Sequence, residues 1–195
     1  MMDNSTTGNT SAKPLLVLDL DETLIRSVAD EGDRECDFEL FVYKVNIRPG
    51  VAEFLEKVQQ WYELAVWSSA SPEYVTAVVC RLFAAPERLK FTWSGRRCTM
   101  KFSADEYHWF PVKTLKKITR HGFRLERTLI VDDTPSTAIR NYGNLIRVRP
   151  FFGDQSDREL SLLAAYLYSI RDIPNFRALE KRLWRMEAET LPPAP

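Results

Sequence analysis

Two aspartates, Asp19 and Asp21, stand one residue apart directly after a short apolar run. A second acidic pair, Asp132 and Asp133, follows another apolar run further along the chain. A carboxylate can attack phosphorus to form an aspartyl-phosphate, and a second carboxylate can act as general acid and base. Two acidic pairs repel each other unless a cation joins them, and oxygen ligands of this kind suit Mg²⁺. The two pairs therefore predict metal-assisted chemistry at a phosphate ester, with Asp19 as nucleophile and Asp21 as acid and base.

Other polar residues can complete such a site. Ser68 ends a further apolar run and can donate a hydrogen bond to phosphate, beside the backbone N–H groups of the helix that follows. Lys113 precedes the third apolar run, where its ammonium can neutralise phosphoryl charge. Thr23 can steady the first loop through local hydrogen bonds. Each residue alone is also typical of a turn or a solvated surface, and only their joint order along the chain favours a shared site.

The elements that must position these residues alternate between apolar runs and amphipathic segments. Apolar runs at 15–18, 64–67 and 128–131 predict buried strands, and residues 145–148 predict a shorter strand. Apolar residues three and four positions apart predict helices after residues 48–50, after residues 71–73, at 112–120, after residues 134–135, at 156–170 and at 172–189. Ser71 is the expected N-cap of the second helix, and Ser156 with Glu159 forms a capping box. The alternation predicts an α/β fold, a parallel sheet with helices on both faces and a ligand site at the carboxyl ends of its strands.

Length and composition indicate one globular domain. The chain has 195 residues, and 45% hydrophobic with 28% charged residues exclude wholesale disorder. The polar residues 1–13 predict a disordered tail, and the proline-rich residues 191–195 predict another. Between them we expect a single domain at 14–190 that carries a small insertion at about 90–110.

Charge and cysteine content narrow the expected partners. The 27 Lys and Arg balance the 27 Asp and Glu, so nucleic-acid binding through bulk charge is not expected. No apolar run reaches the length of a membrane span, and residues 1–13 lack the apolar core of a signal peptide. Cys36, Cys80 and Cys98 are odd in number and widely spaced, as is typical of a reducing compartment. We expect a cytoplasmic protein, or a nuclear one if the source is eukaryotic.

The order of these motifs resembles that of the haloacid dehalogenase (HAD) superfamily. Within it, the chain resembles the FCP/SCP-type phosphatases, which are also called NLI-interacting-factor-like phosphatases. The resemblance covers about residues 14–170, and its most specific parts are motif I (DxDxT) and motif IV (VD[DN]SP). The matching segments are DLDET at 19–23, RPGVAEFL at 48–55, WSSA at 67–70 for motif II, VKTL at 112–115 for motif III and IVDDTP at 130–135 for motif IV.

The resemblance implies a Rossmann-like sheet and Mg²⁺-dependent hydrolysis of phosphomonoesters, often phosphoserine in protein tails. It implies that Asp19 is nucleophile and metal ligand, and that Asp21 is the acid and base whose main-chain carbonyl binds metal. It also implies that Asp133 is a metal ligand, that Asp132 is its acidic neighbour and that Lys113 stabilises charge. The residues predicted to bind substrate are Thr23, Arg48, Ser68 and Ser69.

The substrate stays open at this point. The insertion between motifs II and III is short, and Lys116, Lys117 and Arg120 lie at helical spacing after the basic pair Arg96 and Arg97. These residues are typical of a solvated helix face, but they also suit a larger anion. The same chemistry on a nucleotide, a nucleic-acid 3′ or 5′ end or another small phosphomonoester is therefore an alternative to a phosphoprotein substrate. A non-catalytic scaffold on the same fold is a second alternative, and both intact motif I aspartates count against it.

Overall fold

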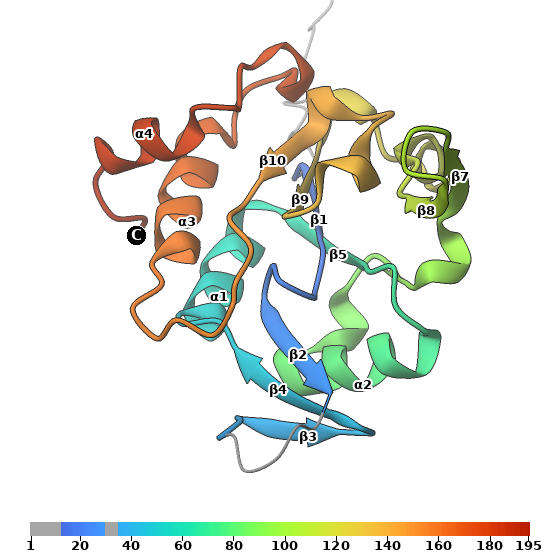
Figure 1. The fold of residues 1–195 in the computed structure, drawn as a ribbon. Helices are drawn as coiled ribbons and strands as arrows, with labels where there is room; N and C mark the ends of the chain where they lie inside the picture. Colours follow the sequence, from blue (N-terminus) through green and yellow to red (C-terminus); the bar gives the residue numbers. More distant parts are fainter. Residues whose placement is uncertain (1–12, 30–34) are drawn as a thin grey trace, which may run out of the picture.

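A five-stranded parallel sheet forms the centre of the molecule, in the order β10-β9-β1-β5-β6 (Figure 1). The computed structural model describes residues 13–29 and 35–195, so the predicted N-terminal tail lies outside the described residues except for Lys13. The parallel pairing confirms the predicted α/β fold. In spatial order, the strands are Leu145–Arg147 (β10), Thr128–Asp132 (β9), Leu15–Leu18 (β1), Glu63–Trp67 (β5) and Thr92–Trp93 (β6).

The carboxyl ends of β1 and β9 flank the point where the strand order reverses. From β1 the chain proceeds through β5 to β6 on one side, and it later forms β9 and β10 on the other side. Leu18 of β1 lies opposite Val66 of β5 and Val131 of β9. Ligands of such sheets bind at this reversal, outside the strand ends. The sheet order therefore brings Asp19 and Asp132 to one edge.

Helices cover both faces of the sheet, as predicted, but they differ in kind. Because side chains alternate along a strand, Leu16 and Leu18 of β1 join one apolar core and Leu15 and Val17 join the other. The first core contains residues of α1 (Val51–Trp61), α2 (Pro72–Leu82), α3 (Glu159–Ile170) and α4 (Trp184–Glu189). The second contains residues of two 3-10 helices, η3 (Leu115–His121) and η5 (Pro135–Ala138). None of the helices in the described part of the chain has the length and apolarity that a bilayer crossing requires.

The starts of α1 and α2 agree with the sequence predictions. Gly50 precedes α1 with φ of 82°, a left-handed conformation that glycine adopts without strain. Ser71 caps α2, and its hydroxyl accepts a hydrogen bond from the backbone N–H of Tyr74 at 3.3 Å. Pro72 occupies the first turn of α2, where its missing N–H costs no hydrogen bond.

Two small antiparallel sheets flank the central one. A three-stranded sheet in the order β2-β4-β3 follows β1, and the β7–β8 hairpin lies in and just beyond the predicted insertion (Figure 1). Their strands are Ile25–Ala29 (β2), Phe38–Leu40 (β3), Tyr43–Ile47 (β4), Thr99–Ser103 (β7) and His108–Val112 (β8). The remaining 3-10 helices are Pro86–Arg88 (η1), Gly95–Arg97 (η2), Leu125–Arg127 (η4), Tyr142–Asn144 (η6) and Phe176–Ala178 (η7).

The helix predicted at 112–120 is wrong in its start and its type. Val112 is the last residue of β8, where it pairs with Thr99, and the helical residues form the 3-10 helix η3. Lys113 lies between these two elements, with its backbone N–H donating to the carbonyl of Thr137 at 2.7 Å. This contact holds Lys113 in a connection instead of a helical turn. Gly122 ends the helix in the left-handed conformation.

The capping box predicted at Ser156 and Glu159 does not form. The Ser156 hydroxyl donates to Asp154 Oδ1 at 2.7 Å, and α3 begins only at Glu159. The Glu159 carboxylate accepts hydrogen bonds from the Arg149 backbone N–H at 2.7 Å and from the Arg185 guanidinium. Because these tertiary contacts occupy the Glu159 side chain, it does not reach back to cap its own helix.

The single helix predicted at 172–189 is also wrong. The segment contains η7 and the short α4, and Phe176 and Trp184 are buried while Leu183 and Met186 are exposed. Pro174 disfavours helical backbone at Ile173, so a helix does not continue from Asp172 into this segment.

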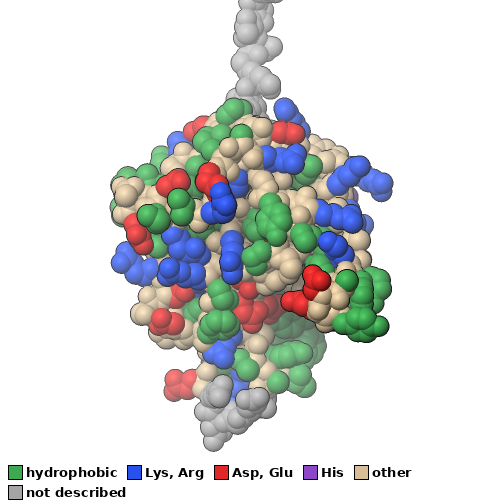
Figure 2. All heavy atoms as spheres, turned by 45° about the horizontal axis from the view of Figure 1, so that its top comes forward, with side chains coloured by type: hydrophobic (Ala, Val, Ile, Leu, Met, Phe, Trp, Pro, Cys, Tyr) green, Lys and Arg blue, Asp and Glu red, His purple; other side chains and the backbone are tan. Residues whose placement is uncertain are grey.

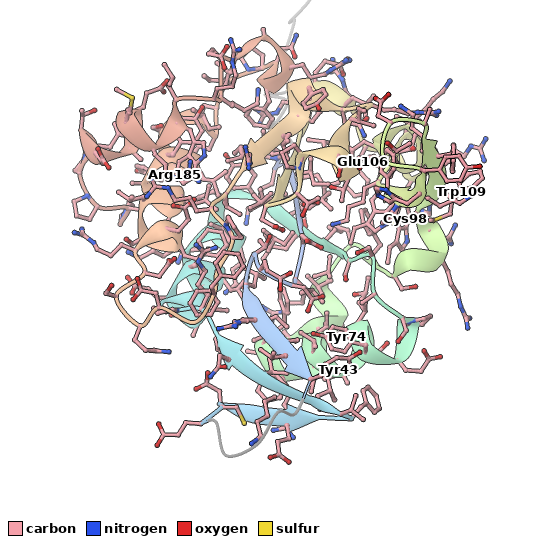
Figure 3. The ribbon with its side chains drawn as sticks, viewed as in Figure 1. Tyr43, Tyr74, Cys98, Glu106, Trp109 and Arg185 are labelled. Carbon is pink, nitrogen blue, oxygen red and sulfur yellow. The ribbon has the colours of Figure 1, made fainter. Side chains whose placement is uncertain are left out.

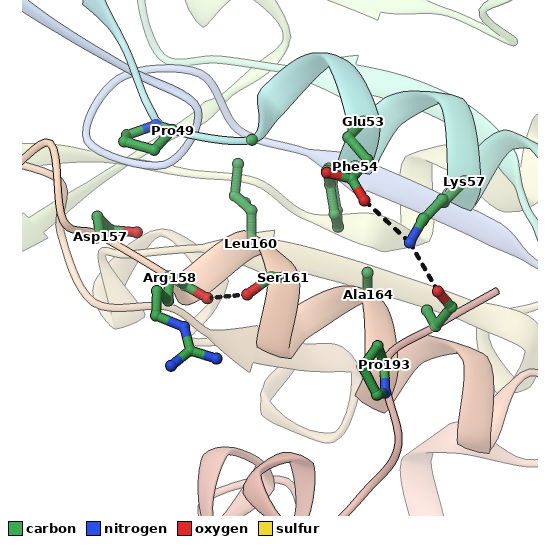
Figure 4. A pocket seen from close by; sticks show the side chains of 12 residues that line it. Pro49, Glu53, Phe54, Lys57, Asp157, Arg158, Leu160, Ser161, Ala164 and Pro193 are labelled. Atoms are coloured by element: carbon green, nitrogen blue, oxygen red, sulfur yellow. Dashed lines mark hydrogen bonds and ion pairs between the residues drawn. The ribbon is translucent and has the colours of Figure 1, made fainter.

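The predicted C-terminal tail at 191–195 contacts the domain. Ala194 is buried, and its carbonyl accepts a hydrogen bond from Lys57 Nζ on α1 at 2.7 Å. Together with α1 and α3, these last residues enclose a pocket of about 280 Å³ (Figure 4). In this pocket, Glu53 Oε1 lies 3.1 Å from Lys57 Nζ (Figure 4). The C-terminal residues therefore pack against the helical layer.

Candidate active site

Three carboxylates meet where β1 and β9 end. Asp19 follows β1 directly, and its backbone N–H donates to the Val131 carbonyl of β9 at 3.0 Å. Asp132 is the last residue of β9, and Asp133 follows it. One carboxylate oxygen from each of Asp19, Asp132 and Asp133 lies within 4.8 Å of the other two. The structure thus brings together the first and last acidic motifs, as expected from parallel strands that share an edge.

Lys113 links two of these carboxylates. Its Nζ lies 2.6 Å from Asp19 Oδ1 and 2.8 Å from Asp132 Oδ2, and its side chain is fully buried. Burial acts to lower the pKa of Lys113, but the two adjacent carboxylates outweigh it and raise the pKa above its ordinary value. Asn141 Nδ2 donates to the Lys113 carbonyl at 2.7 Å and fixes the backbone at this residue. The ammonium therefore stays charged beside Asp19.

Asp132 is held on both oxygens. Its Oδ1 accepts a hydrogen bond from the Thr134 backbone N–H at 2.9 Å. Its Oδ2 accepts from Lys113 and lies 2.6 Å from the Thr137 hydroxyl. Asp132 is fully buried, and these contacts with the protein engage both of its oxygens. Thr137 was missed in the sequence, because a threonine in the first turn of a short helix is not distinctive.

Asp133 is steadied by two threonines. The Thr23 hydroxyl donates to Asp133 Oδ1 at 3.4 Å, and the Thr134 hydroxyl donates to Oδ2 at 3.0 Å. Thr23 was predicted to bind substrate, but its side chain has no exposed surface. It positions Asp133 from the motif I loop instead.

Asp21 points to a different neighbour from the other acidic residues. Its Oδ1 accepts a hydrogen bond from the Tyr74 hydroxyl of α2 at 2.5 Å. Its carboxylate is outside the three-carboxylate cluster of Asp19, Asp132 and Asp133. The metal ligand predicted at this position is the main-chain carbonyl, which does not require the Asp21 side chain to join the cluster. Tyr74 was also missed, because a tyrosine on the apolar face of a helix is usually a core residue.

The site carries more negative charge than Lys113 can neutralise. Burial raises the pKa of Asp19, Asp21 and Asp133 above the usual aspartate value, and Lys113 partly opposes this at Asp19. Burial, together with the negative charges of Asp21 and Asp133, also raises the pKa of Glu22 to about 7. A cluster of carboxylate oxygens with one buried ammonium fits a hard divalent cation such as Mg²⁺. Asp19 and Asp133 would hold it, with Asp132 beside them.

Ser68 and Ser69 lie at the end of β5, next to β1. The Ser68 side chain is buried, and its hydroxyl accepts a hydrogen bond from the Ala70 backbone N–H at 3.0 Å. Its own backbone N–H donates to the Trp93 carbonyl at 2.9 Å. Ser69 is exposed. The end of β5 therefore carries one buried and one exposed serine at the strand next to β1, which Asp19 follows.

Arg48 is not available to a substrate in the way that was predicted. Its guanidinium is fully buried and contacts the Asp157 carboxylate twice, at 2.9 and 2.7 Å. It also donates to the carbonyls of Thr23 and Arg149 at 3.0 and 2.9 Å. These contacts tie the motif I loop to the segment before α3. Arg48 is therefore a buried structural contact of the motif I loop.

Comparison with known proteins agrees with this geometry. A model of the NLI interacting factor-like phosphatase family matches residues 14–177. The chain is 31% identical to CTD nuclear envelope phosphatase 1B of Danio rerio over 90% of this chain and 77% of that protein. It is also 31% identical to CTD nuclear envelope phosphatase 1 homolog of Caenorhabditis elegans, over 93% of this chain and 76% of that protein.

A solved structure shares the fold. The chain is similar to the structure of Fcp1, an essential RNA polymerase II CTD phosphatase. The superposition covers 93% of this chain and 68% of the Fcp1 chain, with a TM-score of 0.64. At 16% identity this likeness establishes the fold alone. The family match and the relatives confirm the resemblance that the motifs suggested. The chain therefore belongs to the NLI interacting factor-like phosphatases, a branch of the HAD-type phosphatases.

Proposed function

We propose that the domain hydrolyses phosphomonoesters with Mg²⁺ through a phosphorylated Asp19. The observation that carries this proposal is the contact of Lys113 with Asp19 Oδ1 at 2.6 Å, inside a cluster that also contains Asp132 and Asp133. The ammonium holds one oxygen of Asp19, which leaves Oδ2 to act as the nucleophile. A fixed carboxylate beside a permanent positive charge favours attack on a phosphoryl group, because no reorganisation is needed as charge develops.

The first step transfers the phosphoryl group to Asp19. Its free oxygen forms a bond to phosphorus, while the bond from phosphorus to the ester oxygen breaks and leaves its electron pair on that oxygen. Asp21 donates a proton to the departing oxygen, which leaves as an alcohol. Lys113 neutralises charge on Asp19 and the phosphoryl oxygens. Mg²⁺, when bound, supplies further neutralisation of the phosphoryl charge.

The second step releases phosphate. Asp21, now ionised, takes a proton from water while the water oxygen bonds to phosphorus. The bond between phosphorus and Asp19 breaks, and its electron pair returns to the carboxylate. Inorganic phosphate leaves, and both aspartates are restored to their starting states. One acid–base residue thus serves both steps in opposite directions.

The substrate class we propose is phosphoserine or phosphothreonine in a protein. The named CTD phosphatases among the relatives support this choice. The surface gives less support to a nucleic-acid substrate, because Lys and Arg side chains are interspersed with Asp and Glu on the face shown in Figure 2. The relatives are named nuclear envelope phosphatases, and of the two locations expected from the sequence these names favour the nuclear one.

The test compares substrates at fixed Mg²⁺. We expect hydrolysis of p-nitrophenyl phosphate that EDTA abolishes and Mg²⁺ restores, and higher kcat/KM on phosphopeptides than on 3′- or 5′-phosphorylated oligonucleotides. Preference for the oligonucleotides, lost when Lys116, Lys117 and Arg120 are changed to Glu, would instead support a nucleic-acid end as substrate. Absence of turnover on every substrate by folded protein would support a scaffold.

A further inference from the structure

Tyr74 joins three elements at the hydroxyl that contacts Asp21. The Tyr74 hydroxyl donates to Asp21 Oδ1 at 2.5 Å, and the Ser27 hydroxyl contacts the same Tyr74 oxygen. Tyr74 belongs to α2, Ser27 to β2, and Asp21 to the loop after β1. The phenol therefore ties the motif I loop to a helix and to the small sheet.

The Tyr74 ring is held in place. Its side chain is only 6% exposed. The Tyr43 ring packs edge-on against it, with 5.8 Å between ring centroids and an interplanar angle of 79°, and Figure 3 shows the two rings side by side. The backbone N–H of Tyr74 is bonded to the Ser71 cap of α2. Since ring and backbone are both fixed, the position of the hydroxyl is fixed as well.

The hydrogen-bond inventory decides which oxygen of Asp21 can carry a proton. A phenol has one proton and stays neutral near pH 7, because its ordinary pKa is about 10. The Tyr74 hydroxyl donates to Asp21 Oδ1, and the Ser27 hydroxyl contacts the same phenol oxygen. With Oδ1 engaged by the phenol, Oδ2 is the oxygen of Asp21 that remains to carry a proton toward a substrate.

We propose that Tyr74 is a positioning residue that directs the proton of Asp21 to the leaving oxygen. This inference rests on the proposed function, in which Asp21 is the acid and base. In the transfer step, the proton moves from Asp21 Oδ2 to the ester oxygen as the phosphorus–oxygen bond breaks. Asp21 becomes a carboxylate and still accepts the Tyr74 hydrogen bond on Oδ1. Without the phenol, the carboxyl group can rotate, and its proton occupies either oxygen.

The test uses leaving groups of different basicity. A strongly basic leaving oxygen needs the proton of Asp21, whereas the acidic p-nitrophenol leaves with little help. We expect Tyr74→Phe to lower kcat/KM for phenyl phosphate by about tenfold or more. For p-nitrophenyl phosphate, which has nearly the same shape, we expect a change of less than about threefold. Ser27→Ala should show the same asymmetry with a smaller amplitude, since it removes the hydroxyl that contacts the Tyr74 oxygen.

A matched control separates positioning from packing. Tyr62 is another buried tyrosine, and its hydroxyl donates to the Leu167 carbonyl at 2.8 Å far from the site, so Tyr62→Phe removes a comparable hydrogen bond. It should affect both substrates equally. Equal losses on both substrates in Tyr74→Phe would overturn the inference and leave Tyr74 a packing residue.

Failure of the inference and failure of the proposed function give different results. Asp21→Asn removes the acid itself, so its kcat/KM should fall much more for phenyl phosphate than for p-nitrophenyl phosphate. If Asp21→Asn shows this asymmetry and Tyr74→Phe does not, the acid role stands and the positioning role is overturned. If neither variant shows it, the acid role of Asp21 is overturned, and the inference with it.

Discussion

Lys113 Nζ and Asp19 Oδ1 lie 2.6 Å apart in a contact that is almost wholly buried. The same ammonium reaches Asp132 at the end of the neighbouring strand, so one side chain bridges β1 and β9. Such a bridge is strong in the low dielectric of the interior, and it orients the carboxylate before a substrate arrives. The buried ammonium thus offsets part of the negative charge that Asp19 and Asp132 bring to one edge of the sheet.

Asp19→Asn should abolish turnover and leave the fold intact. The amide keeps the shape of the side chain, and its oxygen can still accept from Lys113, but it cannot attack phosphorus. We expect a loss of at least about 10³-fold in kcat on p-nitrophenyl phosphate. Circular dichroism should be unchanged. Activity close to wild type would contradict the assignment of the nucleophile.

Lys113→Met should damage both activity and stability. It leaves Asp19 and Asp132 buried without their shared cation, and breaking a buried ion pair in this way costs about 3–5 kcal/mol of unfolding free energy. Loss of the charge at the site should lower kcat by about 10²-fold or more. Urea denaturation and p-nitrophenyl phosphate hydrolysis measure the two effects. Lys116→Met, at an exposed position of η3, is the control and should change stability by less than about 0.5 kcal/mol.

Mg²⁺ should stabilise the folded protein. A ligand that binds only the native state adds about 2.7 kcal/mol at a concentration one hundred times its dissociation constant. The melting temperature should therefore rise with Mg²⁺ and fall again with EDTA. Asp133→Asn should lose most of this response while remaining folded, because it removes one of the clustered carboxylates. An undiminished response in Asp133→Asn would show that the ion binds elsewhere.

The ion pair of Arg48 and Asp157 should make stability depend on acidic pH. Burial acts to raise the pKa of Asp157, but the hydrogen bonds from Arg48 and from the Glu159 backbone outweigh it, and the pKa lies below its usual value. Because the folded pKa is lowered, the stabilisation is complete above the ordinary aspartate value of about 3.9 and is lost as pH falls through the folded pKa.

Asp157→Asn measures this contribution. The variant leaves the buried Arg48 guanidinium without a counter-charge, and we expect a loss of about 3 kcal/mol in unfolding free energy at pH 7. Urea denaturation at pH 7 and pH 3 should show that the gap between wild type and variant narrows at pH 3. A gap that does not change with pH would contradict the assigned pKa direction.

Gly95→Ala should impair the loop that carries Ser68 and Ser69. A Cβ at Gly95 would collide with the backbone carbonyl of Ser69, and the Gly95 N–H donates to the Ala70 carbonyl at 2.8 Å. A shift of this loop by a fraction of an ångström should lower kcat/KM by about tenfold or more. Gly122→Ala is the control: a Cβ there meets nothing, although its φ of 84° is strained. It should cost stability and leave kcat/KM unchanged.

The sequence determined the sheet and the meeting of its acidic ends. Continuous apolar runs at 15–18 and 128–131 are buried on both faces, and parallel strands bring their carboxyl ends to the same edge. The position of Asp19 beside Asp132 and Asp133 follows from that rule. The start of α2 could also be predicted from the sequence, because Ser71 and Pro72 act within a single helical turn.

Only the tertiary structure decided which side chains support those aspartates. Asp21 accepts a hydrogen bond from Tyr74, and Arg48 and Glu159 are likewise bonded, to Asp157 and to Arg185. Each of these pairs joins residues that are far apart in the sequence. Local sequence patterns do not predict such partners. The pairs are stabilised because they satisfy polar groups that folding has removed from water. The acidic residues of the site could therefore be identified from the sequence. The orientation of their side chains depends on contacts that exist only after the chain has folded.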